Sequence, residues 1–254
     1  MANKYVDFIS DEYLLECIQK LHQSYTKAKA DITTKKFYKN KIDIFKQTFD
    51  EHFNNTTTEE IIENEIIRQV DKSYGGAIGA FHENVLGGIE GFEVGKQSGY
   101  DVKKNDNTLF ADIKNKHNTM NSPAMEGLYI KLQKFADEHK SANCYWVQIL
   151  AKDSFIANWE GDINGKEYRH SRVYKISGDK FYEMLTKDPR ALYKLYKSLP
   201  DAISDYFKTQ TGGSSEIVSS ALEEISNLAK SNSKPISDQI AKDNYPYYSG
   251  FDEL

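Results

Sequence analysis

The stretch from Gly99 to Thr119, GYDVKKNDNTLFADIKNKHNT, contains two acidic residues and a lysine at a spacing that can build a reactive site. Asp106 and Asn107 separate two strand-like runs and tolerate the backbone of a tight hairpin turn. A two-residue loop there sets Asp101 directly opposite Asp112. Their Cβ atoms would lie about 5 Å apart, and like charges at that separation repel each other.

This repulsion predicts a cation between the two carboxylates. Mg²⁺ is usually held by one or two carboxylates together with water and phosphate oxygens. Because side chains alternate along a strand, Lys114 shares a face with Asp112. This group suits hydrolysis of a phosphodiester, since the metal activates water and the lysine stabilises negative charge in the transition state.

The stretch allows two other interpretations. Asp101 and Asp112 also stand at the first and last positions of an EF-hand calcium loop, but Asp106 replaces the required glycine and the flanks are strand-like. A solvated hairpin with ordinary surface charges is the second alternative. It leaves the Gly-x-Asp before the hairpin and the helix after it as coincidences, so the metal site is favoured.

The elements that must position these residues follow from hydrophobic periodicity. Residues 11 to 70 read as helices, with Thr58 as an N-cap, and Gly75 and Gly76 end that pattern. We expect strands at 100–104, 108–116, 144–151 and 172–176, and helices at 77–90, 125–139, 179–185, 191–207 and 216–230.

A strand pair, a crossover helix and a third strand predict an α/β (α+β mixed) fold, with a small mixed β-sheet flanked by helices and a helical N-terminal region. We expect residues 1–74 to form that helical region, packed on the core. The core would span 75–208, and 209–254 would hold a linker, a C-terminal helix and a tail.

Composition limits the class of protein. The net charge is −5 and the pI about 5.8, which argues against coating nucleic acid by bulk positive charge but allows a local basic cleft. Cys17 and Cys144 are the only cysteines, and no signal peptide or membrane-length apolar run is present. We expect a cytoplasmic protein that needs no disulfide and does not enter a membrane.

The hairpin resembles a known family. Gly99-Tyr100-Asp101 followed by Asp112-Ile113-Lys114 is similar to the PD-(D/E)XK nuclease core, although tyrosine replaces the usual proline and Asp112 the commoner glutamate. The continuation ADIKNKHNTMNS resembles type II restriction endonucleases that cut GGNCC or GGWCC sites.

The resemblance implies a restriction-endonuclease-like core in which Asp101 and Asp112 bind Mg²⁺ and Lys114 is the catalytic lysine. Glu83 matches the upstream acid that many members contribute to catalysis and metal binding, but Glu90 lies on much the same helical face and the choice stays open. The implied activity is Mg²⁺-dependent hydrolysis of double-stranded DNA at a short palindromic site, giving 5′-phosphate ends.

Polar residues that follow the second acid have donors and acceptors suited to phosphates and base edges. They are Asn115, Lys116, His117, Asn118, Thr119 and Asn121. Direct reading of guanine would call for Arg or Lys donors, for which the candidates are Arg169, Arg172, Lys152 and Lys175.

A palindromic site implies a homodimer, because two-fold DNA is matched by a two-fold protein. Tyr193, Tyr196 and Tyr206 could supply its interface. A DNA methyltransferase would be the functional partner of a restriction enzyme. The alternatives are a DNA repair or recombination endonuclease with the same core, and a DNA-binding module without activity.

Overall fold

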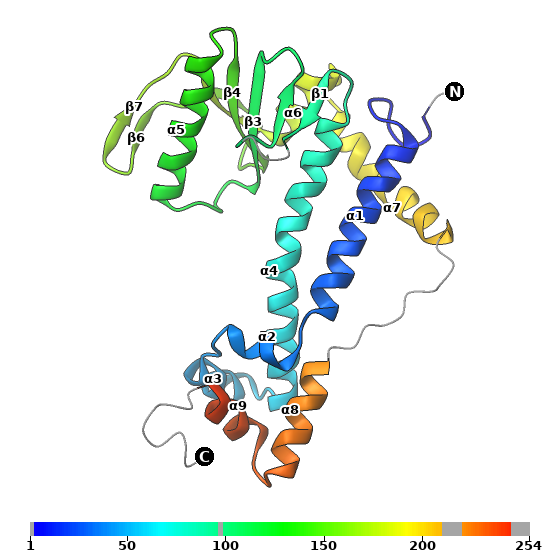
Figure 1. Ribbon diagram of the computed structural model, residues 1–254, viewed down its shortest axis with the longest axis vertical. Coiled ribbons are helices and arrows are strands. Elements are labelled where there is room, and N and C mark those ends of the chain that lie inside the picture. The colour runs from blue at the N-terminus through cyan, green and yellow to red at the C-terminus, as the bar shows by residue number, and fades with distance from the viewer. Residues whose placement is uncertain (1–2, 96–98, 210–219, 245–254) are drawn as a thin grey trace. The chain divides into compact units, whose positions relative to one another are not determined.

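The computed structural model describes residues 3–95, 99–209 and 220–244 (Figure 1). The chain forms two compact units. The first, here called the sheet unit, combines the N-terminal residues up to Leu21 with the chain from Ala77 to the end of α7. The second, the helical unit, combines His22–Gly76 with α8 and α9. Among the described residues, no helix is long and apolar enough to cross a membrane.

The sheet unit is built on six strands in the order β1-β2-β3-β4-β8-β5. These strands are β1 (Phe92–Val94), β2 (Val102–Lys104), β3 (Leu109–Lys116), β4 (Asn143–Leu150), β8 (Val173–Ser177) and β5 (Ile156–Asn158). β3, β4 and β8 are mutually parallel, whereas β1, β2 and β5 pair antiparallel. The predicted mixed sheet flanked by helices is confirmed.

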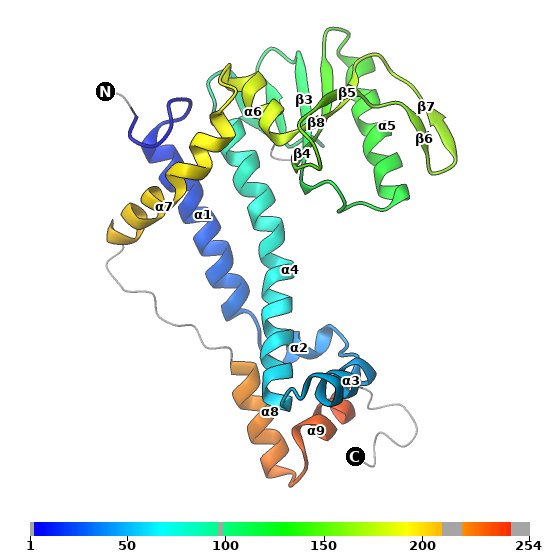
Figure 2. The same cartoon turned by 180° about the vertical axis from the view of Figure 1, so that it is seen from behind.

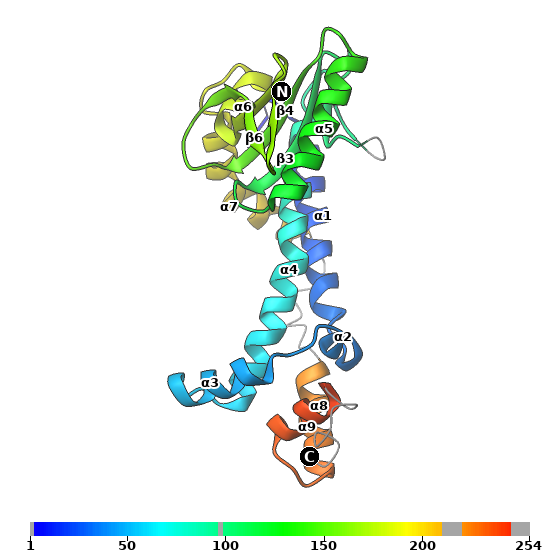
Figure 3. The ribbon, with the colours of Figure 1, turned by 90° about the vertical axis from the view of Figure 1, so that its left-hand side faces the viewer.

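Helices cover both faces of this sheet (Figure 3). On one face, α5 (Ser122–Glu138) packs through Leu128, Tyr129 and Leu132 onto the even-numbered side chains of β3 and β4, among them Phe110 and Trp146. The opposite face packs against the C-terminal end of α4 (Thr58–Gly87) and against α1 (Asp11–Ala30), α6 (Gly178–Thr186) and α7 (Ala191–Thr209). Each face thus has its own apolar core.

The hairpin between β2 and β3 has the register that its sequence predicts. Val102 pairs with Ala111 and Lys103 with Phe110, which leaves Asp106 and Asn107 at the turn. Asn107 has a positive φ of 58°, which asparagine tolerates. Helix α5 then connects β3 to the parallel strand β4, so the predicted crossover is also confirmed.

A small hairpin of β6 (Gly161–Ile163) and β7 (Lys166–Tyr168) was not predicted. Glu126 of α5 holds it, because its carboxylate accepts hydrogen bonds from Asn164, Lys166 and Tyr168, each 2.7 Å long. These donors hold the pKa of Glu126 at about 2. Figure 2 shows the hairpin lying beside α5.

The helical unit contains the rest of α1 and α4, with α2 (Thr34–Lys39), α3 (Ile44–Asn54), α8 (Ser220–Ser231) and α9 (Ile236–Asn244). Ile32, Phe37, Ile62, Ile225 and Ile240 are buried in its core, which therefore joins residues from both ends of the chain. Residues 216–219 of the predicted C-terminal helix, and most of the predicted linker, lie outside the described residues.

Helix α4 (Thr58–Gly87) corrects the expected break at Gly75 and Gly76, because it continues through both glycines. It begins one residue earlier than the predicted N-cap, Thr58, implies. Thr57 is the cap, since its Oγ accepts from the Glu60 N–H at 3.2 Å while the Glu60 carboxylate accepts from the Thr57 N–H at 2.8 Å.

We expect Gly75→Ala and Gly76→Ala each to raise the free energy of unfolding by about 0.5–1 kcal/mol, because alanine favours helix and a Cβ at either position meets open space. Urea unfolding would measure this. Gly87→Ala, in the same helix, is the matched control and should destabilise, because its Cβ would lie 2.8 Å from the backbone nitrogen of Val94. If Gly75→Ala and Gly76→Ala both destabilised the protein, the helix would not be continuous through these glycines.

Neither cysteine is predicted to react in the native protein. Burial raises the pKa of Cys17 to about 11 and that of Cys144 to about 12, so almost no thiolate forms near neutral pH. A thiol reagent at pH 8 should label no residue in the folded protein and two after denaturation. Rapid labelling of either thiol under native conditions would show that its surroundings open.

Candidate active site

Asp112 lies in the middle of β3, and its carboxylate is buried between two lysines. Lys114, two residues along the same strand, forms an ion pair with Oδ1. Lys131, which comes from α5, forms an ion pair with Oδ2. Although Lys114 contacts Oδ1, that oxygen accepts no hydrogen bond of regular geometry. The buried Asp112 carboxylate thus lies between the ammonium groups of two lysines.

Asp101 precedes β2 and lies across the hairpin from Asp112. Its carboxylate accepts a hydrogen bond from the Ile113 N–H at 2.6 Å, which fixes it beside the middle of β3. Burial raises the pKa of Asp101, and the charge of Asp112 raises it further, against the opposing effects of that hydrogen bond and the two lysines. Because strands rather than helices flank the pair, the EF-hand interpretation is wrong.

Glu83, on the last turns of α4, is electrostatically coupled to the same group. Burial raises its pKa to about 7, with further contributions from Asp101 and Asp112 and an opposing one from Lys114. Glu90 is exposed in the turn beyond the end of α4 at Gly87. The structure therefore brings Glu83, and not Glu90, towards the two aspartates.

The charges of this group fit a divalent cation. Three carboxylates face two ammonium groups, and burial alone would lower the pKa of Lys114, yet the acids around it raise that pKa. Within the described residues, no three acidic, His or Cys side chains converge closely enough to hold a metal ion by themselves. Two carboxylates completed by water and phosphate oxygens are nevertheless the usual ligands of Mg²⁺.

Some of the polar residues from the end of β3 to the start of α5 have structural contacts, and others are exposed or half-buried. Asn121 is the N-cap of α5, since its side chain accepts from the Ala124 N–H at 3.0 Å. Thr119 donates to the Lys116 carbonyl at 3.1 Å, and the His117 Nδ1 lies 3.2 Å from the Leu150 carbonyl. Lys116 and Asn118 are exposed and Asn115 is half-buried.

A pocket of about 650 Å³ opens next to this segment. It is lined on the α5 side of the sheet by His117, Trp146, Gln148 and Lys175, and at its rim by Lys152 and Asn164, among others. Lys152 and Lys175 were two of the four expected guanine donors.

The other two guanine donors lie elsewhere. Arg172 is structural, because its guanidinium donates to the carbonyls of His139 and Ala142 at 2.9 and 2.8 Å. Arg169 is paired with Glu160 at 3.2 Å and does not line the pocket.

Two residues of the site were missed from the sequence. In the sequence, Lys131 stands between the apolar residues of α5 and looks like any solvent-exposed lysine of a helix. Gln148 is a buried polar residue within the apolar run CYWVQILA, and the parallel register pairs it with Lys114. An isolated glutamine in a buried strand could have indicated a site residue. Its place beside Lys114, however, depends on the pairing of β4 with β3.

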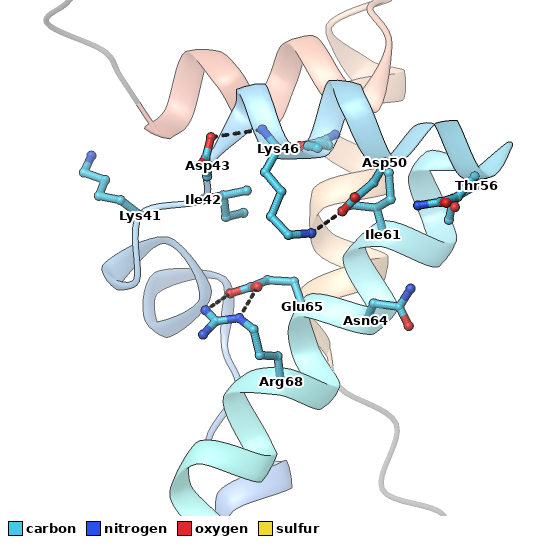
Figure 4. A pocket seen from close by; sticks show the side chains of 12 residues that line it. Lys41, Ile42, Asp43, Lys46, Asp50, Thr56, Ile61, Asn64, Glu65 and Arg68 are labelled. Carbon is cyan, nitrogen blue, oxygen red and sulfur yellow. Dashed lines mark hydrogen bonds and ion pairs between the residues drawn. The ribbon is translucent and has the colours of Figure 1, made fainter. Parts of the chain in front are cut away.

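A second pocket, of about 470 Å³, lies in the helical unit (Figure 4). Its charged side chains largely neutralise one another, since Lys46 pairs with Asp50 and Arg68 with Glu65. None of the expected site residues lines it.

The chain is similar to known proteins over most of its length. The family described as Eco47II restriction endonuclease matches residues 6–208, which include the whole group around Asp112. The chain is 39% identical over 257 residues to the type II restriction enzyme Sau96I of Staphylococcus aureus, with 97% of each chain covered. It is 28% identical over 217 residues to the type II restriction enzyme Eco47II of Escherichia coli, covering 82% of this chain and 90% of that protein.

Proposed function

Because the chain belongs to the Eco47II restriction endonuclease family, it is a site-specific DNA endonuclease, and we propose that it cuts double-stranded DNA with Mg²⁺ at the group formed by Asp101, Asp112 and Lys114. The observation that carries this proposal is the meeting of the buried Asp112 and the half-buried Asp101 across one hairpin, with a lysine paired to Asp112. The names of both relatives favour sequence-specific cleavage over a repair nuclease.

In this proposal each residue has a distinct task. Asp101 and Asp112 would hold the cation, which when bound would supply positive charge to water and to the scissile phosphate. Lys114 orients the attacking water and stabilises negative charge as the water oxygen bonds to phosphorus. The bond from phosphorus to the 3′ oxygen then breaks. The attacking water loses a proton to solvent and the 3′ oxygen gains one from solvent, which leaves a 3′-hydroxyl and a 5′-phosphate.

Lys131 would act beside Lys114. In the protein alone it neutralises Asp112. Because a divalent ion on Asp112 would replace that interaction, the Lys131 ammonium becomes available to the DNA phosphates. Its half-exposed side chain, at 35% of full exposure, allows such a movement.

The proposed target is a short palindromic site of the GGNCC type, which rests on the resemblance of the ADIKNKHNTMNS segment. Lys152 and Lys175, in the pocket beside Gln148, are the proposed donors to guanine. A homodimer would present two such sites to the two strands, and a DNA methyltransferase would protect the host sequence.

Digestion of a fully sequenced phage DNA tests this function. With Mg²⁺ we expect discrete fragments whose 5′-phosphate ends map to one short palindrome, and with EDTA no cleavage. Smearing without fixed ends, or selective cutting of branched DNA, would contradict the restriction function.

Glu83→Gln should lower the cleavage rate by roughly ten- to a hundredfold, because Glu83 adds negative charge next to both metal-binding aspartates. Glu90→Gln is the matched control, since Glu90 is exposed beyond the end of the same helix. Steady-state cleavage of a short duplex measures both. Equal losses of cleavage rate in the two variants would show that Glu83 does not act in the site.

A further inference from the structure

Helix α7 has apolar residues on two faces. Its inner face is buried in the sheet unit through Ala191, Leu195, Ala202 and Tyr206. Its outer face carries a second apolar row, the α7 seam, made of Tyr193, Tyr196, Pro200, Ile203 and Phe207. Four of these side chains are large and remain exposed, at 51% for Tyr193, 69% for Tyr196, 38% for Ile203 and 42% for Phe207.

The seam has the spacing of a helix–helix interface. Its residues follow one another at alternate steps of three and four, as do the a and d positions of a coiled coil. With roughly 200 Å² for a large side chain, the exposed parts amount to about 400 Å² of mostly apolar surface. That is about half of the 800 Å² that each partner buries in a standard interface, and the flanking residues would supply the rest.

The seam is also symmetric about Pro200. In an antiparallel pair of α7 helices with the two-fold axis beside Pro200, Tyr193 would meet Phe207 of the other copy, and Tyr196 would meet Ile203. An isologous interface requires a row of residues that is similar when read in either direction along the helix.

Charges on one flank of the seam fit the same arrangement. Lys197 and Asp201 are both exposed and stand on either side of Pro200. The ion pairs of α7 involve Lys194, Asp205 and Lys208, whereas Lys197 and Asp201 make none among the described residues. Antiparallel packing would bring each Lys197 to the Asp201 of the other copy, twice across the axis.

The helical unit offers a rival surface, which the charges favour less. Phe45, Phe49 and Phe53 are exposed along α3. The neighbouring Lys46 and Asp50 already pair with each other, so they offer no charge to a second copy. Moreover, α7 belongs to the same compact unit as Asp101 and Asp112, and α3 does not.

We propose that the α7 seam binds the α7 seam of a second copy of this chain in an antiparallel pair. The inference rests on the proposed function, since a palindromic site calls for two catalytic units. The two-fold axis would then relate the two units that carry the reacting groups.

Charge reversal tests the pairing by analytical ultracentrifugation of the full chain, without DNA or metal. Lys197→Asp and Asp201→Lys should each weaken dimerisation at least about tenfold, and the double exchange should restore it to within about threefold. Lys140→Asp, an exposed lysine outside α7, should leave it unchanged. Single reversals without effect, or a double exchange without rescue, would overturn the proposal, as would a monomeric native protein.

A cross-link tests the position of the axis. Because both native thiols are buried, Pro200→Cys introduces one accessible thiol, which should form a disulfide-linked dimer under mild oxidation. Lys140→Cys should not. A dimer that dissociates with Phe49→Asp but persists with Tyr196→Asp would assign the interface to α3 instead. Dimerisation is measured apart from cleavage, so a dimeric protein that cuts no DNA contradicts only the proposed function.

Discussion

We expect Asp112→Asn to lower DNA cleavage by at least about a thousandfold, because it removes the carboxylate that is proposed to bind the metal ion and that pairs with both lysines. The side chain keeps its size, and one carbonyl oxygen remains to accept from Lys114 or Lys131. Binding of the duplex without metal should persist or tighten, since a negative charge near the phosphates is lost.

The comparison that isolates this effect uses Asp71→Asn, an exposed acid on α4 in the helical unit. Both variants should keep their circular dichroism and oligomeric state. Cleavage would be followed on a duplex containing the mapped site over a range of Mg²⁺ concentrations. Activity of Asp112→Asn within tenfold of the native protein would exclude Asp112 as a metal ligand.

Lys131→Met is expected to have the second-largest effect, with cleavage reduced by roughly a hundredfold. Two changes should accompany it. Metal binding to the DNA-free protein should tighten, because Lys131 no longer competes with the ion for Asp112. The dependence of duplex binding on salt should become shallower by about one phosphate contact.

Lys134→Met provides the control, because Lys134 lies one turn along α5 and pairs with Glu138 rather than with Asp112. Metal affinity is measured by titration calorimetry with Mn²⁺, and duplex binding with Ca²⁺ in place of Mg²⁺. If the two variants behave alike in cleavage and metal affinity, Lys131 is an ordinary surface lysine and Lys114 acts alone.

The sequence by itself determined the hairpin and the acids that face each other across it. Local chemistry decides this part, since the Asp106-Asn107 turn sets the register and strand alternation puts Lys114 on the face of Asp112. The parallel crossover followed for the same reason, because an amphipathic helix lies between two strand-like runs.

Tertiary structure decided which distant residues join the site. Glu83 and Glu90 are equivalent on a helical wheel, and only the end of α4 at Gly87 separates them. Lys131 and Gln148 reach Asp112 and Lys114 through the packing of α5 on the sheet and the pairing of β3 with β4. The two helix predictions that failed, at Gly75-Gly76 and Thr58, concerned continuity and capping, where weak local preferences yield to packing of the whole helix.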